Sequence, residues 1–499
     1  MKLVVSMLSG REVQIEIEDA TTIRELRRRA QKELGFLLSG LVRSSYDLPS
    51  SLTLEKAGLK DGDMVTAVVK SDGIARSCTG FALVRSDMSV VTWGRFGENP
   101  PTSFALSGVE LIFAEWCDFC AILANGTVLT WGESSPPPSK VEQQLAHAET
   151  IDFSMLAFAA TLSDGSVVTW GETDFGGDCS DVQDQLKNVQ LIWASDSAFA
   201  AHRTDGSVVT WGDPDAGGDS SAVQEKLKCV QDMNCTCTAF VAICSDGSAV
   251  AWGNPRNGGD SSAVQDQLKS VQCIQASETA FAAILKNRRV VTWGDPGGGG
   301  DSSPVQHQLR DVRAILGNRS AFAAILGNGS VVTWGSPGDG GDSSSVRQQL
   351  RGVRAIQCTD RAFAAIRYNG SVVTWGDAFA GGDSSRVQAQ LTRVSEIQAN
   401  SFAFAAILED GSVKTWGDPA AGGDSSAVQA DLIDVLQIQY TDRAFAALRA
   451  DGAVVTWGDP EFGADSSSVR EQLGPVQRGV KRRRALQDAT DTPADPAAR

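Results

Sequence analysis

The chain has 499 residues, 42% hydrophobic and 21% charged, which is enough apolar material to build a sizeable globular core. Its formal net charge of −17 argues against broad binding to nucleic acid, because phosphate backbones are bound by clustered lysines and arginines. No run of 18 apolar residues is present, and the first residues lack a secretory layout, so we expect no membrane span and a cytoplasmic or nuclear protein.

Residues 1–70 predict a compact α+β unit. Two strand-like runs, residues 3–5 and 13–17, are joined by Ser9-Gly10. A helix is predicted from Thr22 to Ala30, because Thr22 and Glu25 have the spacing of a capping box. A last apolar run at residues 64–69 predicts another strand.

The same segment resembles ubiquitin, through MKLVVSMLSG for the first hairpin, TTIRELRRRA for the helix and Gly35 for the following turn. The resemblance implies a β-grasp fold for residues 1–72. Leu8 and Val68 match two members of ubiquitin's hydrophobic recognition patch, which implies ubiquitin receptors or proteasome subunits as partners. The segment has no terminal Gly-Gly, so conjugation to other proteins is not expected.

From residue 73 onward the chain is a tandem array. A strand-like run ending in Trp-Gly occurs ten times, with successive spacings of 38, 39 and then seven times 41 residues. A fixed period near forty is typical of a repeat architecture. The repeated tryptophans, which we expect to form the core between units, are Trp93, Trp131, Trp170, Trp211, Trp252, Trp293, Trp334, Trp375, Trp416 and Trp457.

Each copy predicts three strands, as in residues 271–276, 280–285 and 290–293. The second run is apolar throughout, so we place it in the middle of its sheet. Most copies carry Asp-Gly or Asn-Gly between the second and third strands, which favours a two-residue type I′ turn. The copies with Asp87-Met88 and Asn287-Arg288 are expected to turn differently.

A Gly-rich loop and a Ser-x-Val-Gln segment follow each Trp-Gly in most copies, as in Ser303 to Gln306. The segment predicts a short helix that begins with a capping box. An aspartate stands eight residues after most of the tryptophans. These aspartates indicate turn chemistry, a calcium-binding rim or an acidic edge that recruits basic partners.

The array resembles the propeller repeats of the regulator-of-chromosome-condensation family, through its Ala-rich strand, Asp-Gly and Val-Val-Thr-Trp-Gly. In unit length it is similar to the three-stranded blades of the beta-lactamase-inhibitor type II propeller. The resemblance implies a mainly β, ten-unit propeller-like array over residues 73–477, with three strands and a short helix per unit. A closed ring and an open superhelix are both compatible with ten units, and residues 474–477 could complete the first unit, which favours closure.

Few residues predict chemistry. The three histidines, His147, His202 and His307, lie at unrelated phases of the repeat, and Cys117-x-x-Cys120 has no second pair at zinc spacing. The ten cysteines are compatible with packing in a reducing compartment. We therefore expect no enzyme, no catalytic residue, no metal and no cofactor.

Two further features break the pattern. Trp116 and Trp193 replace smaller residues of the other copies and are candidates for a local protein-interaction site. Residues 478–499 are poor in apolar residues and are predicted to be disordered. Within them, Lys481, Arg482, Arg483 and Arg484 form a candidate nuclear import signal.

The sequence favours a monomeric, non-catalytic scaffold. In this hypothesis the array binds a protein partner and the ubiquitin-like segment docks to the ubiquitin or proteasome machinery. One alternative is a regulatory or substrate-selecting subunit of a ubiquitin ligase. A second, by analogy of fold, is a chromatin-associated protein or an exchange factor for small GTPases.

Overall fold

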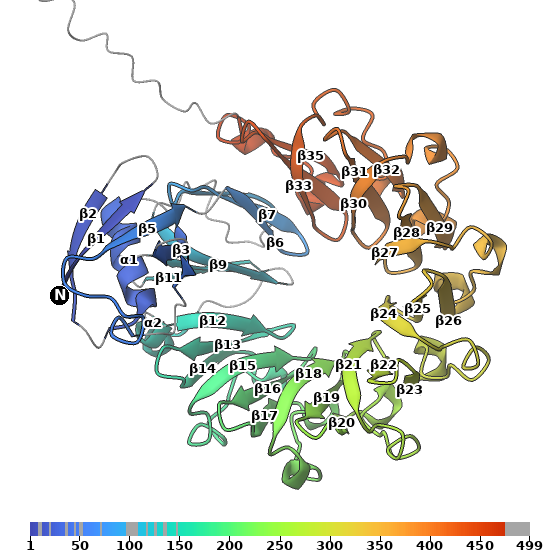
Figure 1. Ribbon diagram of the computed structural model, residues 1–499, viewed down its shortest axis with the longest axis horizontal. Coiled ribbons are helices and arrows are strands. Elements are labelled where there is room, and N and C mark those ends of the chain that lie inside the picture. Colours follow the sequence, from blue (N-terminus) through green and yellow to red (C-terminus); the bar gives the residue numbers. More distant parts are fainter. Residues whose placement is uncertain are drawn as a thin grey trace, which may run out of the picture.

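The computed structural model describes residues 1–7, 12–18, 21–34, 38–43, 46–48, 53–69, 72–95, 108–115, 118–123, 127–132, 137–145 and 148–474. It is mainly β, with one five-stranded sheet followed by ten three-stranded sheets (Figure 1). The expectations for Leu8, Gly35, Trp116, Cys117, His147 and the tail from residue 478 lie outside these ranges.

The N-terminal sheet has the strand order β2-β1-β5-β3-β4, with β1 parallel to β5 and the other pairs antiparallel. Its elements are β1 (Lys2–Met7), β2 (Glu12–Glu16), α1 (Ile23–Leu34), β3 (Leu38–Arg43), β4 (Tyr46–Asp47) and β5 (Met64–Val69). The Glu25 amide donates to the Thr22 hydroxyl, 3.3 Å, as the capping spacing predicts. Leu3, Val5 and Leu26 are fully buried in the core of this unit.

Ten antiparallel sheets of three strands follow, and we number them repeats 1 to 10. Their first strands are β6 (Gly73–Arg76), β9 (Val109–Glu115), β12 (Ala148–Phe153), β15 (Val189–Ala194), β18 (Val230–Cys235), β21 (Val271–Ala276), β24 (Val312–Gly317), β27 (Val353–Cys358), β30 (Val394–Ala399) and β33 (Val435–Tyr440). Their second strands are β7 (Gly80–Val84), β10 (Asp118–Leu123), β13 (Ala157–Leu162), β16 (Ala198–Arg203), β19 (Ala239–Cys244), β22 (Ala280–Leu285), β25 (Ala321–Leu326), β28 (Ala362–Arg367), β31 (Ala403–Leu408) and β34 (Ala444–Arg449). Their third strands are β8 (Val90–Gly94), β11 (Val128–Trp131), β14 (Val167–Gly171), β17 (Val208–Gly212), β20 (Ala249–Gly253), β23 (Val290–Gly294), β26 (Val331–Gly335), β29 (Val372–Gly376), β32 (Val413–Gly417) and β35 (Val454–Gly458).

The sheets are arranged around a central axis, with the first strands inside and the third strands outside (Figure 1). The apolar second strand lies in the middle of every sheet, as predicted, and both of its faces are buried against neighbouring sheets. This is a propeller-type array, and its hydrophobic clusters each combine residues of two successive repeats. Burial therefore depends on stacking, because one three-stranded sheet cannot cover its own faces.

The repeated tryptophan joins a repeat to the one before it in eight of the ten repeats, and the indole nitrogens of Trp131 and Trp170 have no hydrogen-bond partner among the described residues. In all ten repeats it stacks on the phenylalanine of its own second strand, with ring centres 4.7–5.4 Å apart. In repeats 4 to 10 its indole N–H also donates to a glycine carbonyl in the loop of the preceding repeat, as from Trp334 to Gly299, 3.0 Å. The prediction that these tryptophans form the core between units is confirmed.

The same contact closes the ring. The Trp93 indole of repeat 1 donates to the carbonyl of Gly463 in repeat 10, 3.0 Å, and β6 packs against β33. Arg76 lies 3.8 Å from the centre of the Tyr440 ring across this seam. The first sheet has its own first strand, β6. Residues 475–477 of the segment expected to complete the first unit lie outside the described ranges, so that expectation stays a prediction.

A chain of backbone hydrogen bonds runs around the ring at the turns between first and second strands, which we call the turn face. Each amide donates to the carbonyl of the equivalent residue in the next repeat. The bonds run from Met155 to Asp196 (3.0 Å), Asp196 to Cys237 (2.9 Å), Cys237 to Glu278 (3.1 Å), Glu278 to Arg319 (3.2 Å), Arg319 to Asp360 (3.3 Å), Asp360 to Ser401 (3.2 Å), Ser401 to Asp442 (3.3 Å) and Asp442 to Cys78 (2.9 Å).

The hairpins between second and third strands differ from the predicted type I′ turn. The Gly206 amide donates to the Arg203 carbonyl, 2.9 Å, and only the glycine of the Asp-Gly pair has a positive φ, of 82°. This is a three-residue loop with a bulged glycine, which Asp-Gly also suits. The copies with Met88 and Arg288 form the same loop, with φ of 65° and 60°, so the expectation that they turn differently is wrong.

The outer segments contain short helical turns. They are α2 (Ser139–Leu145), η1 (Thr173–Phe175), η2 (Pro214–Ala216), η3 (Gln224–Lys226), η4 (Pro255–Asn257), η5 (Pro296–Gly298), η6 (Pro337–Asp339), η7 (Ser344–Val346), η8 (Ala378–Gly382), η9 (Gln388–Gln390), η10 (Pro419–Ala421), η11 (Pro460–Phe462) and η12 (Ser467–Val469). The predicted capping box is wrong. The glutamine amide instead donates to the carbonyl that begins the third strand, as from Gln306 to Val290, 2.9 Å, and so ties the segment to its own sheet.

The repeated aspartates form turns. The aspartate eight residues after the tryptophan accepts the amide N–H two residues later, as in Asp301 with Ser303, 2.8 Å. Aspartates two residues after the tryptophan accept amides in the following helical turn, as in Asp418 with Ala420, 2.9 Å. Turn chemistry is therefore the confirmed role of these aspartates.

The seam between repeats 10 and 1 can be tested with Trp93→Phe. This change removes the indole donor and leaves the Gly463 carbonyl buried, so we expect the free energy of unfolding to fall by about 1–3 kcal/mol. Trp334→Phe removes the equivalent bond between repeats 6 and 7 and is the matched control. Equal losses in urea denaturation are expected for a closed ring. A loss for Trp334→Phe alone would show that the seam is open.

Asp360 on the turn face predicts a pH dependence. Burial, with Asp442 and Glu278 nearby, raises the pKa of Asp360 to about 6. Its folded pKa therefore lies above the unfolded value, and stability is lost as pH rises from about 4 to about 6. Asp360→Asn removes this loss. We therefore expect the free energy of unfolding of the variant, relative to that of the parent chain, to be higher at pH 7 than at pH 4 by roughly 1–2 kcal/mol after solvent screening.

The contrasting variant for this pH measurement is Asp301→Asn. The amide of Ser303 lowers the pKa of Asp301, so the stability that this carboxylate provides is lost as pH falls. As the pH rises from 4 to 7, the melting temperature relative to the parent chain should therefore rise for Asp360→Asn and fall for Asp301→Asn. A shift of both in the same direction would contradict the assignment.

Candidate interaction groove

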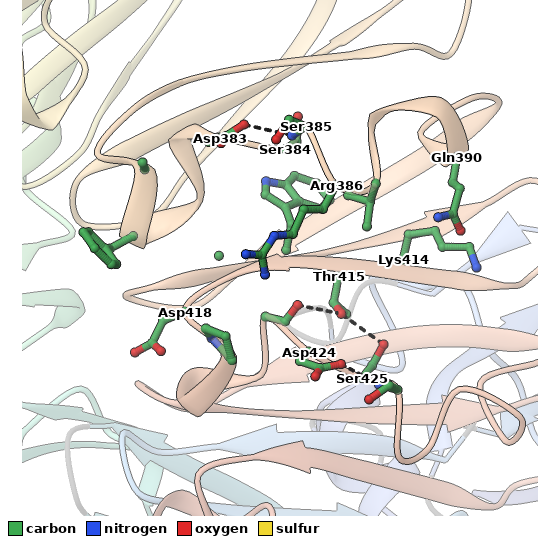
Figure 2. Close-up of a pocket in the computed structure, with 18 of the residues that line it drawn as sticks. Asp383, Ser384, Ser385, Arg386, Gln390, Lys414, Thr415, Asp418, Asp424 and Ser425 are labelled. Atoms are coloured by element: carbon green, nitrogen blue, oxygen red, sulfur yellow. Dashed lines mark hydrogen bonds between the residues drawn. The ribbon is translucent and has the colours of Figure 1, made fainter.

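A groove runs along the outer edge of the ring between repeats 8 and 9. It has a volume of about 860 Å³ and is lined by η8, the segment that follows it, and the third strand and loop of repeat 9 (Figure 2). The equivalent groove between repeats 3 and 4 has about 620 Å³. The grooves share one backbone frame, so their chemistry differs only through the side chains at variable positions.

The frame of the groove is held at Gly381. The Trp416 indole donates to the Gly381 carbonyl, 3.0 Å, and Gly381 has a φ of 94°. A Cβ atom at this position would lie 2.5 Å from the Phe404 ring, so only glycine fits. This wall of the groove therefore has a fixed position.

Phe379 is presented to solvent on that wall. The Asp377 carboxylate accepts the Phe379 amide, 2.8 Å, while the next residue, Ala380, is buried. The phenyl ring is 86% exposed, the most exposed of the large hydrophobic side chains that the structure describes. Equivalent positions in repeats 3 to 7, 9 and 10 hold Asp174, Asp215, Arg256, Gly297, Gly338, Ala420 and Glu461.

Two cations face the same groove. Figure 2 shows the Arg386 side chain extending across the middle of the groove. Lys414 lies at the end of the groove opposite Asp418. Lys414 stands two residues before its tryptophan, where the other nine copies have Val or Leu. In the described ranges, neither the Arg386 nor the Lys414 side chain forms an ion pair or a hydrogen bond with another residue.

The carboxylates of the groove already accept backbone hydrogen bonds. Asp383 accepts the Ser385 amide and Asp424 accepts the Ser426 amide, both at 2.9 Å, and these bonds lower the pKa of both carboxyl groups. Asp418 caps η10 and lies 3.4 Å from the Arg443 guanidinium. Arg386 also contributes to the lowered pKa of Asp383, but neither cation forms an ion pair with a described residue. The groove therefore offers an exposed aromatic ring beside two cations.

The predicted site residues do not gather in this groove. Val68 lies on β5 with 39% of its surface exposed, and its patch partner Leu8 is outside the described residues. Trp193 is half-buried on the inner strand β15, with its ring centre 6.3 Å from that of His202. Trp116 and residues 481–484 are not described.

The arrangement is suited to binding. An exposed aromatic ring and arginine are the side chains most often found at the centres of protein interfaces. In the part of the chain that the structure describes, no three His, Cys, Asp or Glu residues are grouped so that they could hold a metal ion. Neither of the described α-helices is long and apolar enough to cross a membrane.

No family model matches the chain, and the search of curated proteins returned no match either. Three solved structures are similar to parts of it. The ectodomain of the Physcomitrella patens receptor kinase CR4 is 14% identical over 54% of this chain and 73% of its own, with a TM-score of 0.30. The CRINKLY WD40 ectodomain of the Arabidopsis thaliana receptor kinase ACR4 is 16% identical over 53% of this chain and 98% of its own, with a TM-score of 0.30.

The third is the computationally designed Ika8 protein, 14% identical over 62% of this chain and 95% of its own, with a TM-score of 0.29. TM-scores this low carry no argument about this chain. Its propeller-type architecture is established by its ten sheets and their stacking.

Proposed function

We propose that this chain is a non-catalytic protein-interaction scaffold whose repeat array binds a protein partner. The observation that carries the proposal is the convergence of Phe379, Arg386 and Lys414 in the groove between repeats 8 and 9. All three depart from the repeat pattern, and Phe379 is 86% exposed beside the two cations. The rigid ring presents them without a large ordering cost on binding.

The proposal extends to the N-terminal unit, which would dock to the ubiquitin or proteasome machinery. Its sheet order, with a parallel pair at the centre and one helix between β2 and β3, supports the resemblance to ubiquitin. The exposed Val68 supports a recognition face. The scaffold would be intracellular, a setting in which cysteines stay reduced, and the nine described cysteines are free thiols.

The groove is tested by the triple variant Phe379→Ala, Arg386→Ala and Lys414→Val, which restores small or consensus side chains. Loss of a central aromatic anchor typically costs about 2 kcal/mol or more, so partner retention should fall by roughly tenfold or more. The measurement is quantitative affinity capture of proteins from native lysate on the full chain and on the variant.

The matched control carries Arg256→Ala and Glu461→Ala, which change the positions equivalent to Phe379 in repeats 5 and 10. It should retain every partner of the parent chain. If the triple variant retains all of them as well, the groove is not the binding site and the proposal fails.

The N-terminal unit is tested with Leu8→Ala and Val68→Ala together in the full chain. We expect ubiquitin-pathway and proteasome proteins to be lost from the captured set while partners of the groove remain, because the two surfaces are separate. Lys60→Ala, at an exposed position of the same unit, is the control. An unchanged set of partners would show that the likeness to ubiquitin has no role in docking.

A further inference from the structure

A second surface of the ring is strongly basic, although the chain as a whole has a net charge of −17. We call it the basic sector, and it consists of residues 286–289 (KNRR), 310–313 (RDVR), 351–354 (RGVR) and 367–368 (RY). These segments contain eight lysines or arginines and one aspartate. They occupy the hairpins of repeats 6 and 8 and the first-strand starts of repeats 7 and 8, opposite the turn face.

Hydrogen bonds bring these segments together. The Val312 amide donates to the Arg288 carbonyl, 2.9 Å, which joins the start of repeat 7 to the hairpin of repeat 6. Arg313 donates to the Tyr368 hydroxyl, 3.2 Å, and Arg367 donates to the Arg351 carbonyl, 3.1 Å. The four segments therefore form one continuous surface.

The cations of the sector are exposed and mostly lack counter-charges. Arg288 pairs with Asp311, 2.7 Å, and Arg354 donates to the carbonyls of Val394 and Ser395. Arg310 and Arg351 are exposed and form no ion pair with any residue in the described ranges. Their mutual repulsion weakens the free ring and would be relieved by an anionic partner.

Earlier repeats show what the sector lacks. Lys187, Lys228 and Lys269 occupy the same position as Arg310 and Arg351, and each pairs with an acid three residues before it. The residues three before Arg310 and Arg351 are His307 and Gln348. Arg310 and Arg351 therefore lack the carboxylate partner that the lysines of repeats 4 to 6 have.

Apolar side chains extend this surface. Tyr368 is 66% exposed within the sector. Beyond Ser395, which Arg354 contacts, the equivalent position in repeat 10 is Leu436, 66% exposed, and Ile433 nearby is 47% exposed. Repeats 4 to 9 have lysine, arginine or threonine at the position of Ile433, and repeats 3 to 9 have polar or charged residues at the position of Leu436.

We propose that the basic sector, with Ile433 and Leu436 two repeats beyond it on the same side of the ring, docks an extended acidic protein segment that carries an apolar residue. Arginines bind carboxylates in a bidentate manner, and the exposed tyrosine and leucine supply the apolar contact. Charges more than one Debye length apart, about 8 Å, are largely screened, so a short acidic segment interacts mainly with the sector on which it lies. A long nucleic acid would also contact the acidic remainder of the ring, which would repel it. The surface lies apart from the groove between repeats 8 and 9.

The test is fluorescence anisotropy with the full chain and a labelled peptide in which a run of glutamates is followed by leucines. Binding should occur and should weaken as salt is raised. The variant Arg310→Glu with Arg351→Glu should bind the peptide roughly tenfold or more weakly. Leu436→Ser should also weaken binding, and its salt dependence should be unchanged.

The matched control is Lys187→Glu with Lys228→Glu, which makes the same charge change at the same repeat positions outside the sector. It should bind within about twofold of the parent chain. Equal weakening by both double variants, or no binding of the peptide, overturns the proposal. Tighter binding of a single-stranded oligonucleotide than of the peptide overturns it in favour of nucleic acid. The groove variant should bind the peptide normally, so the two sites fail or succeed separately.

Discussion

The fold depends on one repeated contact, the tryptophan that stacks on its own phenylalanine and donates its indole N–H to the preceding loop. Apolar burial alone does not fix the distance between sheets, but this bond requires a glycine carbonyl at one place. The glycine must have a positive φ and must touch the phenylalanine ring, so no other residue fits there. Sheet spacing, loop position and groove width follow from the same few atoms.

A frame defined so tightly leaves few positions free to vary. The free positions lie at the second residue of the helical turns, as at Phe379, and on the hairpins, as at Arg288. Both departures from the repeat pattern occur in the later repeats, on different surfaces of the ring. The ring thereby holds an aromatic groove and a basic surface in a constant relative position, which suits a scaffold that holds two partners at once.

The period, the three strands and the core tryptophans could be predicted from the sequence, because each is a local pattern written ten times. The role of Gln306 could not, because its partner Val290 lies 16 residues earlier and is reached only once the segment folds back. The hairpin type could not be decided because Asp-Gly suits two loops. Lys414 stands out in an alignment of the repeats, but its proximity to Phe379 and Arg386 depends on how successive sheets stack.

Closure of the ring also has a consequence during synthesis. Trp93 and its acceptor Gly463 are 370 residues apart, and Phe81 shares a hydrophobic cluster with Leu448 and Leu473. At translation rates of about 5–20 residues per second, the first sheet waits roughly 20–70 s for the surface that covers it. Throughout that interval its apolar face is available to the same face of another nascent chain. Polysomes that carry several copies thus bring uncovered apolar faces of different chains together before any single ring can close.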